Sequence, residues 1–131
     1  MIQFFIPGEP PTATAQQKGF SRKTGTWYKT AELREAEQKY MAYANEARPA
    51  TPMEGPVQLM VSFWFTAKNG HKPGEPKTSR PDTDNMVKLL KDVLTRCGFW
   101  NDDAQVASEH VSKYWSDVPG IRVKVLSWEK R

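Results

Sequence analysis

Two aspartates stand one residue apart in the stretch SRPDTDNMVKLLKDVL, which starts at Ser79. They are Asp82 and Asp84; Asn85 follows at once, and Lys88 comes one helical turn after Asp84. Carboxylate oxygens are the ligands that hard divalent cations such as Mg²⁺ prefer. A lysine beside them can stabilise the negative charge that develops when a phosphodiester is cleaved. This combination is typical of a metal-dependent site that acts on phosphates.

The same residues also suit the ordinary beginning of a helix. Asp82 or Thr83 can cap the helix, and Asp84 complements the positive end of the helix dipole. Asp84 and Lys88 would then form a surface ion pair worth roughly 0.3 kcal/mol. Asn85 is expected to tie the junction together through side-chain hydrogen bonds. On this stretch alone both interpretations stay open.

A second acidic pair, Asp102 and Asp103, lies in GFWNDDAQV, between the end of a predicted helix and the start of a predicted strand. Adjacent carboxylates repel one another, and no capping role is evident for them, although a simple turn pair is an alternative. Carboxylates that converge from separate elements could hold a divalent cation, which activates water and stabilises charge on phosphorus oxygens. The two acidic junctions together therefore favour the metal site.

The chain also contains two basic segments, the second of which directly precedes the first acidic junction. Residues 18–34 carry five basic side chains against one acid, and residues 68–80 carry four against one. Neither segment has a periodic pattern, so we expect loops, which are either solvated surface or arms that neutralise phosphates. Phe20, Trp27 and Tyr28 could stack on an exposed base or anchor the first loop to the core. The DNA contacts predicted in these segments are Lys18, Arg22, Lys23, Lys68, Lys72, Lys77 and Arg80.

Composition excludes several classes of protein. The chain has 131 residues, 38% of them hydrophobic, which fits a single soluble domain spanning residues 1–131. No apolar run approaches the ~20 residues of a membrane span, and the N-terminus lacks the features of a signal peptide. Cys97 is the only cysteine, so an intrachain disulfide and a Cys-based zinc site are excluded, and the two histidines are far apart, so a His-rich metal site is not expected. We therefore expect a cytosolic (cytoplasmic) protein without a membrane partner.

Hydrophobic periodicity predicts the order β-α-β-α-β-β. Strands follow from alternation of apolar and polar side chains, and helices from apolar residues repeated every three or four positions. The predicted fold class is α+β: a single small domain with a mixed sheet and two helices packed on it. The expected strands cover residues 2–6, 57–65, 106–115 and 121–128, and the expected helices run from Thr30 to about residue 47 and from about 84 to 97.

The two acidic motifs resemble the RusA family of Holliday-junction endonucleases. The resemblance extends over residues 80–113. The family's PDxDNxxKxxxD-L pattern is met by Pro81, Asp82, Asp84, Asn85, Lys88, Asp92 and Leu94, its DDxQV pattern by Asp102, Asp103, Gln105 and Val106, and Lys113 follows in SEHVSKYW.

This resemblance implies a homodimeric, Mg²⁺-dependent nuclease that resolves four-way junctions or other branched DNA by paired nicks, with Mn²⁺ as a substitute metal. It implies that Asp82, Asp84 and Asp103 are the catalytic acids and metal ligands, and that Lys88 is the essential basic helper. Asp102 is a weaker candidate than its neighbour. Lys113 is predicted as a further DNA contact.

Two other functions are compatible with parts of the pattern. A non-catalytic DNA-binding protein could use the same basic loops, but it would gain nothing from carboxylates placed near phosphates. A metal-dependent nucleotide hydrolase would explain the acids but not the two basic segments. Cleavage of a synthetic four-way junction in the presence of Mg²⁺ would separate these functions from a junction endonuclease.

The length of the second predicted helix bears on how the acids could meet. From Asp84 to Cys97 it would span ~20 Å at ~1.5 Å per residue. Asp103 follows six residues later, and six extended residues cover at most ~20 Å. Asp103 could therefore return to the start of its own helix only with almost no slack. A two-fold dimer in which Asp103 completes the partner's site is the easier arrangement.

Overall fold

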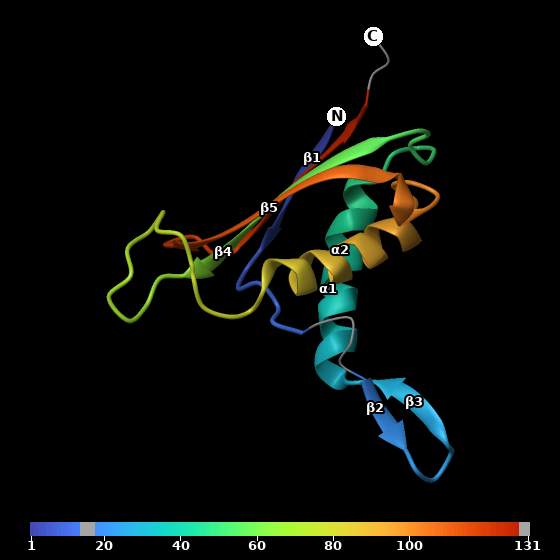
Figure 1. Cartoon of the computed structure of the whole chain (residues 1–131), viewed down its shortest axis with the longest axis horizontal. Helices are drawn as coiled ribbons and strands as arrows, with labels where there is room; N and C mark the ends of the chain where they lie inside the picture. The colour runs from blue at the N-terminus through green and yellow to red at the C-terminus, as the bar shows by residue number, and fades with distance from the viewer. Residues whose placement is uncertain (14–17, 129–131) are drawn as a thin grey trace.

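The computed structural model describes residues 1–13 and 18–128, except for the side chain of Lys18. Strands β1 (Ile2–Pro7), β4 (Val57–Thr66), β5 (Val106–Ser116) and β6 (Gly120–Ser127) form a four-stranded sheet in the order β1-β6-β4-β5 (Figure 1). β4 and β5 pair in parallel, whereas β6 is antiparallel to both β1 and β4. The predicted α+β class with a mixed sheet is thereby confirmed. The other elements are β2 (Lys18–Ser21), β3 (Thr26–Lys29), α1 (Ala31–Ala47), α2 (Thr83–Arg96) and the 3₁₀ helix η1 (Asp103–Gln105).

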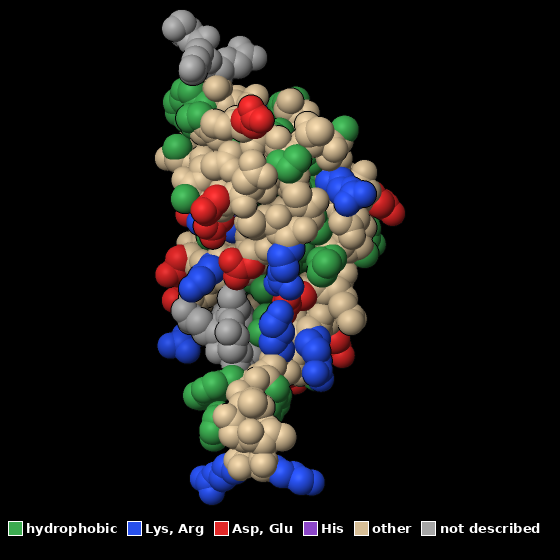
Figure 2. Space-filling model, turned by 90° about the vertical axis from the view of Figure 1, so that its right-hand side faces the viewer, with side chains coloured by type: hydrophobic (Ala, Val, Ile, Leu, Met, Phe, Trp, Pro, Cys, Tyr) green, Lys and Arg blue, Asp and Glu red, His purple; other side chains and the backbone are tan. Residues whose placement is uncertain are grey.

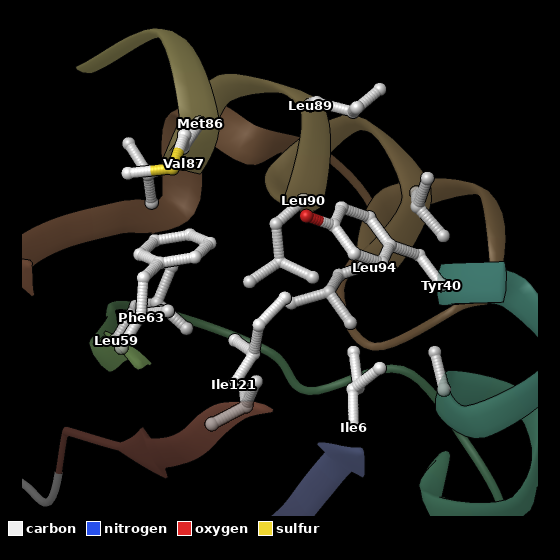
Figure 3. Packing of buried hydrophobic residues seen from close by; sticks show 14 of the residues in the cluster. Ile6, Tyr40, Leu59, Phe63, Met86, Val87, Leu89, Leu90, Leu94 and Ile121 are labelled. Carbon is white, nitrogen blue, oxygen red and sulfur yellow. The ribbon is translucent and has the colours of Figure 1, made fainter. Parts of the chain in front are cut away.

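Both long helices pack on the same face of this sheet. Alternation along β4 turns its apolar side chains toward the helices, as the sequence pattern predicts. Figure 3 shows Tyr40 of α1 beside Leu90 and Leu94 of α2, with Ile6 and Ile121 of the sheet facing them. The buried face of β4 consists of Val57, Leu59, Val61, Phe63 and Phe65, and the buried face of α2 of Met86, Val87, Leu89, Leu90, Val93 and Leu94.

The ends of the helices follow from local chemistry. Thr30 caps α1, and its hydroxyl accepts a hydrogen bond from the backbone N–H of Leu33 at 3.2 Å. Gly98, at φ +83°, follows Cys97 and ends α2 in a conformation that disfavours residues with a side chain. Neither of these helices, nor any other within the described residues, is long and apolar enough to cross a membrane.

The prediction that the first basic segment starts with an irregular loop is wrong. Residues 18–29 form a two-stranded antiparallel hairpin, in which Phe20 lies opposite Trp27 and Gly19 lies opposite Tyr28. The two paired rings are 5.1 Å apart, and a Cβ on Gly19 would lie 2.2 Å from the Tyr28 ring, so glycine leaves room for that ring to cross the strand. Both faces of the hairpin are largely exposed, which is why no alternating pattern predicts it.

The base of the hairpin is attached to the helices through a buried carboxylate. Glu37 of α1 is only 5% exposed and accepts hydrogen bonds from Lys29 of β3, at 2.9 Å, and from Arg96 of α2. Burial raises the pKa of Glu37, but the hydrogen bonds and positive charges of Lys29 and Arg96 outweigh that effect and lower the pKa below its ordinary 4.5. The ionised form is therefore stabilised in the folded protein.

Glu37→Gln should lower the free energy of unfolding by about 2 kcal/mol near neutral pH, because charge-assisted hydrogen bonds are lost. A depressed pKa contributes stability that is complete above 4.5 and disappears as the pH falls through the lowered value. The difference between wild type and variant should therefore shrink in acid. Urea unfolding at about pH 7 and about pH 3.5 measures it. Glu35→Gln, an exposed change on the same helix, is the control; a pH-independent difference would contradict the prediction.

Candidate active site

The start of α2 presents three charged side chains that no other group engages. Asp82 occupies the N-cap position with extended backbone (φ −77°, ψ 145°), but its carboxylate makes no cap hydrogen bond. Among the described residues, none forms a hydrogen bond or ion pair with the side chains of Asp82, Asp84 or Lys88. The ordinary helix-start interpretation requires a side-chain cap or an Asp84–Lys88 ion pair, and neither is formed. These charges are free to bind a ligand.

Lys113 fixes the segment that leads into this site. Its ammonium group reaches from β5 and donates hydrogen bonds to the carbonyl oxygens of Ser79, at 2.6 Å, and Pro81, at 2.8 Å. The peptide bond between Arg80 and Pro81 is cis. The predicted tie through Asn85 is not formed, because its side chain makes no hydrogen bond to any residue in the described part of the chain. Lys113 performs that task instead, whereas its predicted contact with DNA stays a prediction.

The second acidic pair has two different roles in the structure. Asp102 caps η1, since its carboxylate accepts a hydrogen bond from the N–H of Ala104 at 2.9 Å. The side chain of Gln105 accepts from the N–H groups of Asn101 and Asp102, and donates to the carbonyl oxygens of two residues that precede β4. The expectation that this pair caps nothing is therefore wrong for Asp102. The motif DDxQ is a capping box, which the spacing of acid and glutamine could have revealed.

Asp103 lies at the opposite end of α2 from Asp82 and Asp84. It lines a surface pocket with residues of the last turns of α2, including Asp92 and Arg96. α2 has 14 residues and is therefore ~20 Å long. The strand β5 gives a second measure of this separation. It begins at Val106, directly after η1, and reaches the start of α2 only at Lys113, seven positions and about 23 Å further along the strand.

One chain does not bring the three predicted acids together. Within residues 1–13 and 18–128 no group of three or more Asp, Glu, His or Cys side chains is placed to hold a metal ion. Asp82 and Asp84 remain as two hard oxygen ligands with no competing protein partner. They fit Mg²⁺, which is commonly bound by one or two carboxylates together with water and substrate phosphates. Asp103 of the same chain is too far from them to be a third ligand.

The predicted DNA contacts divide into exposed and buried residues. Lys77 is buried, with only 8% of the residue exposed, whereas its predicted contact with DNA stays a prediction. Its ammonium group lies 4.4 Å from the centre of the Trp115 ring and donates to the hydroxyl of Ser79. Burial, together with the neighbouring charges of Lys113 and Lys68, lowers the pKa of Lys77.

The side chain of Lys18, another predicted DNA contact, lies outside the described part. Arg22, Lys23, Lys68, Lys72 and Arg80 are exposed.

The second basic segment is attached to the outer edge of β5. The N–H of Lys77 donates to the carbonyl of Lys113 and the N–H of Trp115 to that of Glu75. His71 stacks on the Trp115 ring, with the ring centres 4.7 Å apart. Residues 68–80 contain no helix and only an isolated bridge to β5. These contacts nevertheless fix the end of the segment beside the start of α2. Lys68, Lys72 and Arg80 are thereby the exposed basic side chains of a segment that is fixed along β5.

Comparisons with known proteins identify the family of the chain. The family profile described as Endodeoxyribonuclease RusA matches residues 7–126. The crossover junction endodeoxyribonuclease rusA of Lactococcus phage r1t is 27% identical over 114 residues, covering 86% of this chain and 87% of that protein. The uncharacterized protein YqaN of Bacillus subtilis strain 168 is 30% identical over 136 aligned positions, covering 95% and 94%. RusA of Escherichia coli K12 is 50% identical over 38 residues, 29% of this chain and 32% of that one. The chain belongs to the RusA family of endodeoxyribonucleases.

Proposed function

We propose that this chain is a Mg²⁺-dependent, structure-selective endonuclease that resolves four-way DNA junctions by paired nicks, with Mn²⁺ as a substitute metal. The observation that carries the proposal is the pair of unengaged carboxylates, Asp82 and Asp84, beside the free ammonium of Lys88. In a protein that only bound DNA, two exposed acids next to the phosphates would weaken the binding. An endonuclease needs them.

The roles of the side chains follow from their positions. Asp82 and Asp84 would hold the metal ion, which when bound supplies a Lewis acid for the scissile phosphate and lowers the pKa of water. Lys88, one turn along α2, is placed to stabilise negative charge on the phosphorus oxygens. Because Asp82 leaves the first N–H groups of α2 without a side-chain cap, these groups also favour an anion at this point. Lys68, Lys72 and Arg80 would hold the DNA backbone.

A direct assay tests the proposal. The protein is incubated with a synthetic four-way junction and with linear duplex of matching sequence, each with and without Mg²⁺. We expect symmetrical nicks in the junction, only with the metal, and no cleavage of the duplex. Binding of the junction without any cleavage at all Mg²⁺ and Mn²⁺ concentrations would support the non-catalytic alternative instead.

We also propose that the protein acts as a homodimer in which Asp103 of one subunit completes the site formed by Asp82, Asp84 and Lys88 of the other. The distance between the two ends of α2 supports this arrangement, because within one chain the acids are ~20 Å apart. A two-fold axis can place two antiparallel copies of one helix so that each start adjoins the partner's end.

Lys88→Ala should slow the chemical step by about 100-fold, as expected when one electrostatic stabiliser of a transition state is lost. Affinity for the junction should change little, since the residue acts on charge that develops during cleavage. Single-turnover cleavage and gel-shift titration of the same samples measure the two quantities. Lys91→Ala, on the next turn of α2 and paired with Glu109, is the matched control. A variant that only binds more weakly would make Lys88 a simple phosphate contact.

Lys113→Met should raise the Mg²⁺ concentration needed for half-maximal cleavage by about 10-fold or more. The change removes both hydrogen bonds that hold Ser79 and Pro81, so Asp82 loses its fixed position, and outer-shell partners commonly have effects of this size. Cleavage rates over a Mg²⁺ titration measure the effect. Lys124→Met on strand β6 of the same sheet controls for loss of a lysine. An unchanged Mg²⁺ dependence would show that the tether does not position the acids.

A further inference from the structure

The β2–β3 hairpin exposes aromatic side chains that nothing in the described chain covers. Trp27 is 69% exposed, Tyr28 52% and Phe20 48%. Phe20 and Trp27 share one face of the hairpin, while Tyr28 lies on the other face across Gly19. Exposed aromatic clusters of this kind mark surfaces that bind a partner. The hairpin lies at the end of α1 that is remote from the four-stranded sheet (Figure 1).

The charge of the hairpin indicates the chemistry of that partner. The chain carries four basic residues and no acid between Lys18 and Ala31. Lys29 is paired with Glu37 at the base, whereas Arg22 and Lys23, in the exposed turn, have no ionic partner in the described part of the chain. Figure 2 shows basic side chains spread at the tip of this narrow projection. Two copies of this positive hairpin would repel each other, whereas an anionic polymer would be attracted to it.

The hairpin is also stiff enough to present its rings in a defined position. An isolated two-stranded hairpin is marginally stable. Here the Phe20–Trp27 pair holds the strands together, and the turn is closed by the hydrogen bond from the N–H of Gly25 to the carbonyl of Ser21 at 2.8 Å. The ion pair between Lys29 and Glu37 attaches the base of the hairpin to α1. The rings are therefore pre-arranged rather than ordered only upon binding.

We propose that this hairpin reads the branch point of the DNA: Phe20 and Trp27 stack on base faces that become exposed where the helical arms of a junction separate, while Arg22 and Lys23 contact the adjoining phosphates. Aromatic side chains stack on any base, and apolar side chains can wedge between bases that are already unstacked. Continuous duplex offers no such faces. This assignment rests on the proposed junction substrate. It makes the hairpin the element that selects branched DNA over continuous duplex.

The test measures binding in EDTA, so that it does not depend on cleavage. Trp27→Ala should raise the dissociation constant for a four-way junction by about 10-fold, as expected when one stacked base is lost, and leave that for linear duplex unchanged. Trp27→Phe, which keeps an aromatic ring, should retain most of the junction affinity. Trp128→Ala removes another exposed tryptophan, outside the hairpin, and should change neither constant. A fluorescent base analogue, 2-aminopurine, beside the branch point should be quenched by wild type but not by Trp27→Ala.

Three results would overturn the inference. Equal weakening for junction and duplex would make Trp27 a general DNA contact, and unchanged binding of both would remove the residue from the DNA surface. A change in the oligomeric state of Trp27→Ala, measured by sedimentation, would make the hairpin a contact between subunits. A protein that binds junctions through Trp27 but never cleaves them would contradict the proposed function and leave this inference standing.

Discussion

Asp84→Asn should abolish nicking of a four-way junction while junction binding stays as strong as in the wild type or becomes stronger. The amide keeps the shape of the side chain but removes one of the two free carboxylates that we propose as metal ligands at the start of α2. We expect the cleavage rate to fall by at least about 1,000-fold, equivalent to about 4 kcal/mol of lost transition-state stabilisation. Binding should not suffer, because the change also removes a negative charge that repels phosphate.

Nicking and gel-shift assays on the same samples separate the two effects. Asp82→Asn should behave in the same way as Asp84→Asn. Asp117→Asn, an exposed change in the turn between β5 and β6, is the control and should leave both cleavage and binding unchanged. Wild-type cleavage rates in Asp84→Asn would remove this carboxylate from the site.

Periodicity predicted the elements that have one buried face. β4 alternates between core and surface, and both long helices carry an apolar stripe, so the sequence pattern reflects the side of each element that packs. The hairpin of β2 and β3 has no buried face, and it is held by the contact between Phe20 and Trp27, by the hydrogen bond of its turn and by the ion pair at its base. Such a pair across a four-residue turn leaves no periodic signal. Sequence reasoning therefore missed the element that the fold buries least.

The candidate site was predictable only as far as local spacing allows. The motif around Asp82 and Asp84 identifies the start of α2, since these residues lie close together in the chain. Lys113 lies 34 positions from Ser79 and 32 from Pro81 in the chain. Its hydrogen bonds to them therefore depend on where β5 runs beside the segment that precedes α2. The burial of Lys77 depends on the Trp115 ring in the same way. Contacts of this kind follow from tertiary packing and not from any pattern along the chain.

A heterodimer of Asp84→Asn and Asp103→Asn chains should nick a four-way junction once. If each site takes Asp84 from one subunit and Asp103 from the other, one site collects both substitutions and the second is fully intact. The distance between the ends of α2 is the reason to expect this, because Asp103 lies beside the last turns of the helix that Asp84 begins. If each site lay within one chain, both would carry a lesion.

The two chains are co-expressed with different tags, and the heterodimer is isolated by two affinity steps. A plasmid that extrudes a cruciform gives the readout, since one nick yields an open circle and paired nicks yield a linear product. Both homodimers are expected to be inactive in either arrangement, so exchange of subunits cannot create a false signal. Open-circle product from the heterodimer alone establishes that the site is shared. A folded heterodimer that binds junctions and leaves the plasmid supercoiled would place Asp103 in the site of its own chain, and a movement of ~20 Å would then be needed to bring it there.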